Sequence, residues 1–189
     1  MKTQYLSILF GLILSSCLNS QDNVSNTTKA LPEKIVNEIP DFDIHFPETS
    51  FEVKKKVSSP SNMPDVTVTN WILEGKNENG PFMYFVTHNK MTKELELLIN
   101  KDRSQLNLAF QGMLTGSAQK LGGYDFLFTK TEYNGYQGMA SECKVMNGEG
   151  IIKSRVFLIE GDVFVISGGG KSIDIEGLDA FLNSFKIKE

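Results

Sequence analysis

The sequence predicts an α+β protein with an antiparallel sheet of about six to eight strands, one helix in the middle of the chain and one near the C-terminus. Short segments of alternating apolar and polar residues recur along the chain, and turns containing Asn or Gly separate them. Apolar residues follow helical spacing in two other segments, 106–117 and 175–185. The composition, 40% hydrophobic and 22% charged, is that of an ordinary globular domain.

The N-terminus has the layout of a bacterial lipoprotein signal. Lys2 gives it a positive start, and 6–14 is an apolar run that is too short to cross a bilayer, which needs about 20 apolar residues. The run ends at Leu14-Ser-Ser-Cys17, which resembles the lipobox, where the cysteine is acylated and the peptide before it is removed. We therefore expect a signal peptide at 1–16 and a lipid on Cys17. The alternative is an ordinary cleaved signal in which Cys17 is incidental.

Residues 17–40 predict a flexible tether, because they are mostly polar or charged and show no sustained periodicity. A lipid on Cys17 would hold the folded domain, 41–189, at a membrane of the cell envelope. Leu18 stands where Asp would favour the inner membrane, so the outer membrane is favoured in a cell that has two. The net charge of −4, with one small basic cluster at Lys54-Lys55-Lys56, argues against nucleic acid as the partner.

The first half of the domain predicts short strands at 42–46 and 51–57 and then a hairpin. Lys55 shares a face with the apolar residues of the second strand, which is typical of an edge strand protected against intermolecular pairing. Strands at 66–74 and 82–88 follow, and Asn and Gly between them favour a hairpin turn. The next segment, 91–100, has both strand alternation and helical propensity, and its structure stays open.

The second half predicts a helix, a four-stranded meander and a closing helix. The first helix begins near Asp102 or Ser104 and ends at Gly122-Gly123. It presents one buried stripe: Leu106, Ala109, Phe110, Met113, Leu114 and Ser117. The meander strands are expected at 124–133, 136–146, 151–160 and 163–167. The closing helix presents a stripe that must pack against the sheet: Ile175, Leu178, Phe181, Leu182 and Phe185.

The stretch Gly168-Gly-Gly-Lys-Ser172 resembles part of a phosphate-binding loop. The full motif needs a glycine at the position that Val165 holds here. Asp174 and Glu176 lie at the start of the following helix, at the positive end of the dipole that a phosphate would use. We expect no nucleotide site, and we predict a strand-to-helix connection with Ser172 as the cap. Weak anion binding by the Gly168–Gly170 amides is the alternative.

Cysteine chemistry is not expected in the folded domain. The chain has two cysteines, so with Cys17 acylated only Cys143 is free and no intramolecular disulfide can form. Period-2 alternation places Cys143 on one face with Met139 and Val145, and Glu142 lies on the other. We therefore expect Cys143 in the core, the alternative being a reactive thiol.

Histidine and aromatic residues give weaker signals. His45 lies in Asp43-x-His45-x-x-Glu48, a possible metal ligand set, although a solvated strand end is the simpler interpretation; His88, the other histidine, has no ligand spacing nearby. No Gly-x-Ser-x-Gly signature is present, so we expect no catalysis and assign no cofactor. Five aromatic residues are expected in the core or in cross-strand pairs, a ligand-binding face being the alternative: Trp71, Tyr84, Tyr124, Tyr133 and Tyr136.

Four short motifs occur in the second half of the domain: Gly135-Tyr-Gln-Gly138 followed by Glu142, Arg155-Val-Phe-Leu-Ile159, Val163-Phe-Val-Ile166 and Leu178-Asp-Ala-Phe-Leu-Asn-Ser-Phe-Lys186. They resemble motifs of the PsbP-like family, and Phe46-Pro47 and Tyr84-Phe-Val86 fit more loosely, so the resemblance covers most of residues 41–189. The chain departs from the family at Met139-Ala140, where a Pro-Gly-like turn would follow. The resemblance implies an antiparallel sheet flanked by helices, an α/β/α sandwich. Because family members serve as accessory subunits or protein-binding modules, it implies no shared reaction.

The sequence thus predicts a non-catalytic binding or accessory module, held to the bacterial envelope by a lipid, whose partner is another envelope protein. Nucleic acid and nucleotides are not expected as partners. Two alternatives stay open. One is a carrier or sensor of a small apolar ligand held between the sheet and a helix. The other is a hydrolase with a metal or carboxylate centre near His45.

Overall fold

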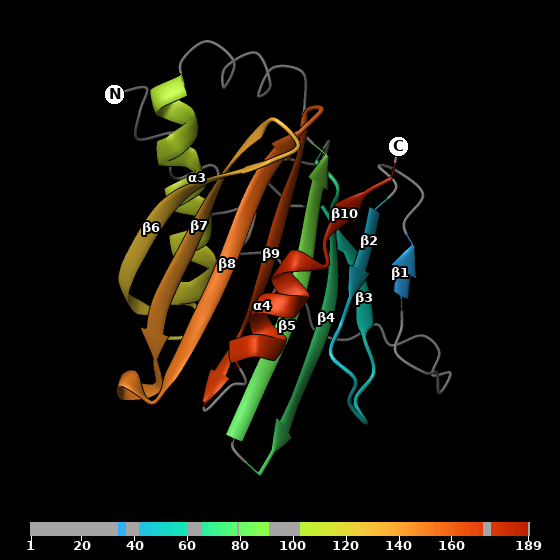
Figure 1. Cartoon of the computed structure of the whole chain (residues 1–189), viewed down its shortest axis with the longest axis vertical. Coiled ribbons are helices and arrows are strands. Elements are labelled where there is room, and N and C mark those ends of the chain that lie inside the picture. Colours follow the sequence, from blue (N-terminus) through green and yellow to red (C-terminus); the bar gives the residue numbers. More distant parts are fainter. Residues whose placement is uncertain are drawn as a thin grey trace.

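The computed structural model of the chain describes residues 34–36, 42–59, 66–78, 80–90, 103–171 and 175–188. The expected signal peptide, Cys17, the segment 91–100 and Ser172 lie outside these residues. The described part has a seven-stranded antiparallel sheet, a three-stranded sheet and two α-helices (Figure 1). The prediction of an α+β protein with a mostly antiparallel sheet is therefore confirmed. None of the described helices is long and apolar enough to span a membrane.

The seven-stranded sheet has the order β3-β4-β5-β9-β8-β7-β6. Its strands are β3 (Lys54–Ser58), β4 (Val68–Asn77), β5 (Gly80–Lys90), β6 (Tyr124–Tyr133), β7 (Tyr136–Val145), β8 (Gly150–Ile159) and β9 (Asp162–Lys171). The β4–β5 hairpin and the meander β6–β9 were both predicted, and the pairing of β5 with β9 joins them into one sheet. Strands β3 and β6 form its two edges.

Tight turns connect the meander where the sequence predicts them. Asn134 and Gly135 have φ angles of 47° and 83° between β6 and β7, the left-handed pair that a type I′ hairpin turn requires. Glu160 and Gly161, with φ angles of 52° and 85°, form the turn between β8 and β9. These turns position consecutive strands antiparallel with little intervening chain.

A small second sheet with the order β1-β2-β10 lies beside the main one. It consists of β1 (Lys34–Val36), β2 (Phe42–His45) and β10 (Lys186–Ile187). Only β2 was predicted; β1 lies within 17–40, where the sequence predicts a tether. Strands of two or three residues are too short to show alternation, so only tertiary pairing reveals them.

The helices α3 (Arg103–Gln119) and α4 (Ile175–Asn183) lie on opposite faces of the main sheet. The apolar stripe of α3 packs in one core with Val163 and Val165, whereas that of α4 packs in another with Phe164 and Ile166. Successive side chains of a strand point to opposite faces, so the two cores lie on either side of β9. Figure 1 shows α4 in front of the sheet and α3 behind it.

Both helices end at specific caps. Gly122 has a φ of 78° and follows α3, and the amide of Gly123 donates to the Ala118 carbonyl at 2.8 Å, as the predicted glycine stop requires. The guanidinium of Arg155 donates to the Leu182 carbonyl at 3.2 Å and to Asn183 Oδ1 at 2.8 Å. Because a cation at a helix C-terminus also complements the helix dipole, Arg155 fixes α4 to β8.

Strand β3 lies at an edge of the main sheet, as the sequence predicts from Lys55. It begins at Lys54 and not at Phe51, and it pairs on one side only, with β4. The ammonium of Lys55 lies 5.5 Å from the centroid of the Trp71 ring, within the range of a cation–π interaction. Lys55 therefore covers an aromatic ring at the edge of the sheet. Lys54 forms an exposed ion pair with Glu74.

Candidate functional site: an apolar pocket beside α3

The glycine run lies inside β9, which extends to Lys171 instead of ending at Ser167 as predicted. Gly168–Gly170 pair with β5 on one side and with β8 on the other. In a strand with two neighbours, the backbone N–H groups are used by the sheet. The predicted strand-to-helix connection is thus wrong for these glycines, and the alternative of anion binding by their amides does not fit.

Close packing explains why glycines occupy this part of β9. A Cβ at Gly168 would lie 2.6 Å from Leu178 Cδ1 and 2.7 Å from Tyr84 Cδ1, and one at Gly170 would lie 2.5 Å from the Pro81 carbonyl oxygen. These distances are shorter than the ordinary non-bonded contacts of a carbon atom. The glycines therefore let α4 and β5 lie directly on β9.

A pocket of about 420 Å³ lies between the β4–β5 hairpin and the C-terminal end of α3. Phe85, one of its walls, packs against the α3 core, which places the pocket on the α3 face of the sheet. The other apolar residues that line it come from separate segments: Pro81, Phe82 and Met83 (β5), Leu121 (after α3), Val145 (β7), Met146 (the β7–β8 turn) and Ile152 (β8). Its size falls in the range of small-molecule sites.

Polar groups are few in this pocket. Ser167 lines it and is 1% exposed, and its Oγ lies 2.7 Å from Oγ of Ser154, which is also 1% exposed. Glu74 is the one charged residue among the described residues of the lining. Its carboxylate lies 3.1 Å from Lys54 Nζ, and both side chains are more than half exposed. The pocket thus combines apolar walls with a buried hydroxyl pair and an exposed acid at its rim.

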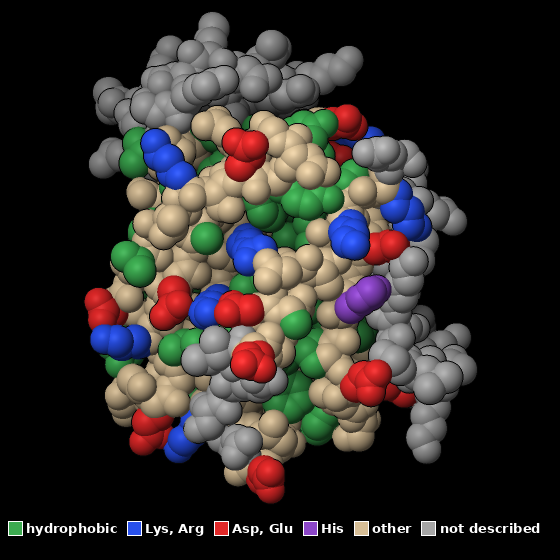
Figure 2. All heavy atoms as spheres, in the orientation of Figure 1, with side chains coloured by type: hydrophobic (Ala, Val, Ile, Leu, Met, Phe, Trp, Pro, Cys, Tyr) green, Lys and Arg blue, Asp and Glu red, His purple; other side chains and the backbone are tan. Residues whose placement is uncertain are grey.

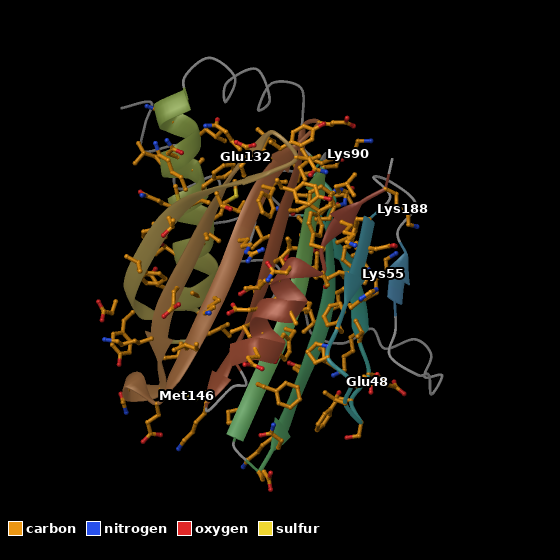
Figure 3. The ribbon with its side chains drawn as sticks, viewed as in Figure 1. Glu48, Lys55, Lys90, Glu132, Met146 and Lys188 are labelled. Carbon is orange, nitrogen blue, oxygen red and sulfur yellow. The ribbon has the colours of Figure 1, made fainter. Side chains whose placement is uncertain are left out.

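Met146 lies at the mouth of this pocket in an unusual backbone conformation. Met146, Asn147 and Gly148 have φ angles of 52°, 55° and 89°, and a left-handed conformation is uncommon for residues other than glycine. Met146 is 39% exposed, and Figure 3 shows it at the same end of the sheet as the β4–β5 hairpin. An ion pair of Glu149 with Lys171, 2.6 Å long, holds the turn to β9. Strained residues cluster at functional sites, so this turn belongs to the candidate site.

A second hollow, of about 230 Å³, lies on the α4 face beside Asp179 and Arg155. Three of its four charged lining residues contact other parts of the protein: Lys153 Nζ lies 2.9 Å from Asp179 Oδ1, and Arg155 caps α4. The fourth, Glu142, is exposed. On the face that Figure 2 shows, basic and acidic side chains are interspersed and form no large patch of one sign. This hollow is better explained as the attachment of α4 than as a binding site.

Cys143 occupies the core position that the alternation predicts. It is 3% exposed and lies on the same face as Met139 and Val145, which are equally buried, whereas Glu142 and Lys144 are exposed. Burial raises the pKa of the Cys143 thiol from 9.0 to about 11. The thiol is therefore protonated at neutral pH, and the alternative of a reactive nucleophile is not supported.

The histidines do not assemble a metal site. His45 is exposed at the end of β2, as a solvated strand end would be. His88 is buried, stacks on Phe164 with 4.9 Å between ring centroids, and has its Nε2 3.4 Å from Asp162 Oδ2. No cluster of three or more His, Cys, Asp and Glu suited to a metal occurs in the described part of the chain, which includes Asp43 and Glu48.

Four of the five aromatic residues considered as a ligand face belong to the core under α4. Trp71 and Tyr84 are buried, and Tyr133 and Tyr136 are half-buried and opposite each other in β6 and β7. Tyr124 is 43% exposed at the far end of β6. They form core contacts and a cross-strand pair, so the aromatic-face alternative does not fit.

The pocket could not be predicted from the sequence, because its walls come from β4, β5, β8, β9, the end of β7 and the segment after α3. Of the lining residues, Gly168–Gly170 had been considered as a binding site, but for an anion. Comparison with known proteins supplies no relative, since no protein-family model matches the chain and no curated protein is significantly similar to it. Function is therefore argued from the site itself.

Proposed function

We propose that the protein is a lipid-anchored, non-catalytic binding module of the bacterial envelope. The Leu14-Ser-Ser-Cys17 motif supports the anchor, with the outer membrane favoured by Leu18. The arrangement of α3 and α4 on opposite faces of an antiparallel sheet supports a PsbP-like α/β/α sandwich. The tether then lets the domain reach ligands near the membrane.

The apolar pocket beside α3 is the observation that carries the binding function. We propose that it holds a small apolar molecule between the sheet and the segment that follows α3. A concave, largely apolar site of about 420 Å³ suits a small molecule, whereas a stable protein partner buries about 800 Å² on each side. A small ligand is thus favoured over the envelope-protein partner at this site.

The test is binding of N-phenyl-1-naphthylamine, a dye whose fluorescence rises in apolar surroundings. The protein is the chain from residue 17 with Cys17→Ser, which keeps every described strand and helix. We expect saturable binding, and we expect Met83→Lys to abolish it because a charge enters the pocket. Leu108→Lys is the matched control, since Leu108 is 49% exposed on α3 and does not line the pocket. Absent binding, or equal binding by the two variants with unchanged thermal stability, would refute the proposal.

A partner protein is the second candidate, at the edge strand β6. This strand is ten residues long and pairs only with β7, and Leu127 on it is 67% exposed. Exposed edges bind extended peptides by strand addition. We expect a photo-crosslinker at position 127 in intact cells to capture one recurrent envelope protein that a crosslinker at Lys76 does not. Capture of the same proteins from both positions would argue against a specific partner.

A further inference from the structure

We propose that the pocket selects uncharged ligands, with an apolar alkyl or aromatic body and a single hydroxyl or carbonyl group, and that it excludes carboxylates. This inference rests on the proposed function, because it specifies which apolar molecules the pocket accepts. It follows from three features of the lining: the sign of its charge, the use of its backbone amides, and the buried pair of hydroxyls.

The charge of the lining disfavours an anion. Glu74 is the charged member among the described lining residues, and it is negative. The nearest basic residue along β9, Lys171, does not line the pocket and forms a 2.6 Å ion pair with Glu149. Lys54, 3.1 Å from the Glu74 carboxylate, is already paired with it and is more than half exposed. An entering carboxylate would therefore lose its hydration without gaining a buried cation, which is unfavourable in an apolar site.

The backbone of the pocket offers an anion no compensation. Ser167–Gly170 contribute to the lining from β9, and each of them pairs with both β5 and β8. Backbone amides that stabilise a buried carboxylate must point at it, whereas these lie in the plane of the sheet and bond neighbouring strands. The glycine run thus exposes backbone to the pocket without supplying free donors.

The hydroxyl pair suits one neutral polar group. Ser167 and Ser154 each have one O–H donor and two acceptor lone pairs, and the 2.7 Å bond between them uses one of the two protons. If Ser154 donates in this bond, Ser167 can donate its own proton to a ligand oxygen; if Ser167 donates, its free lone pair can accept. A ligand alcohol or carbonyl can meet this requirement without any charge.

The rest of the lining recognises shape only loosely. Met83 and Met146 have flexible, polarisable side chains that adapt to different apolar surfaces, and the Phe85 ring provides a flat wall. These walls accept an alkyl chain or a ring equally well. Discrimination between ligands must therefore come from the polar group that each one carries.

The experiment compares three molecules with the same alkyl chain: 1-dodecanol, dodecanoate and dodecylamine. Each displaces N-phenyl-1-naphthylamine from the chain starting at residue 17 with Cys17→Ser, at neutral pH and below the concentration at which micelles form. We expect 1-dodecanol to bind at least about tenfold more tightly than dodecanoate and than dodecylamine, which is a cation at neutral pH. Equal or tighter binding of dodecanoate would overturn the selectivity while leaving the binding function intact. Failure of the dye itself to bind would overturn both.

A pair of serine variants tests the hydroxyl assignment. Ser167→Ala should weaken 1-dodecanol binding about fivefold more than it weakens dye binding, as loss of one neutral hydrogen bond to the alcohol would. Ser141→Ala is the matched control, because Ser141 is buried opposite Ser154 in β7 and does not line this pocket. Unchanged 1-dodecanol binding by Ser167→Ala, or an equal loss in both variants, would overturn the role of Ser167.

Discussion

Gly168→Ala should destabilise the fold, because the added methyl group has no space. Its position lies 2.6 Å from Leu178 Cδ1 and 2.7 Å from Tyr84 Cδ1, with Leu178 fully buried in α4. Overpacking of a core costs about 1–3 kcal/mol, and replacing Gly by Ala within a strand offsets about 0.5–1 kcal/mol of that cost. We expect the variant to lose about 1–2 kcal/mol of its free energy of unfolding.

A second substitution separates this clash from general disturbance of the strand. Leu178→Ala alone should cost about 3–4 kcal/mol, because it opens a cavity under α4. That cavity receives the methyl group of Gly168→Ala, so the double variant should lose at least about 1 kcal/mol less than the two single losses added together. Tyr84 limits the rescue, because it contacts the same position from β5.

Urea denaturation of the chain from residue 17 with Cys17→Ser measures these values, since Trp71 is the single tryptophan and is buried in the same core. Gly112→Ala is the control: nothing lies within 4 Å of its added Cβ in α3, so it should stabilise by about 0.5–1 kcal/mol. Additivity of Gly168→Ala and Leu178→Ala to within about 0.5 kcal/mol would refute the packing argument.

Three further predictions concern single residues. The pKa of the Cys143 thiol is about 11 in the folded protein and near 9.0 in the unfolded chain. The free energy of unfolding should therefore fall as pH rises from about 9 to about 11, because the unfolded chain loses the proton first. Urea titrations over this pH range should show a shallower fall for Cys143→Ala. Labelled palmitate should enter the wild-type protein in bacterial cells but not Cys17→Ala; label in the variant would contradict the anchor. Arg155→Ala should cost about 1–2 kcal/mol of unfolding free energy, because the Leu182 carbonyl loses its donor; an unchanged urea midpoint would show that the cap contributes nothing.

Elements with strong local patterns were predictable from the sequence. The alternation of Val163-Phe-Val-Ile166, the Asn134-Gly135 turn and the stripe of α3 are each set by residues close together in the chain. The remainder of β9 was missed because glycine has low strand propensity. Gly168–Gly170 adopt a strand because they pair with β5 on one side and with β8 on the other.

The candidate site could be predicted only in part. Cys143 was placed correctly because a single strand decides which face a residue occupies. The pocket is different, since Met83, Leu121 and Ile152 lie far apart in the sequence and meet only after β5 pairs with β9. The left-handed conformation of Met146 was also hidden, because the sequence predicts a strand over 136–146 and Met146 is its last residue.

The glycine run connects the fold to the proposed binding site through Ile152. A Cβ at Gly169 would lie 2.6 Å from Ile152 Cγ1 and 2.5 Å from the Ile151 carbonyl oxygen, so any side chain there would displace a wall of the pocket. Upstream, Val163–Ile166 carry large side chains that fill the cores on both faces of β9. On the α3 face, Ser167 and Gly169 follow these residues with a small side chain or none, so β9 no longer fills the core there. This change in composition therefore determines where the core on the α3 face ends and the pocket begins.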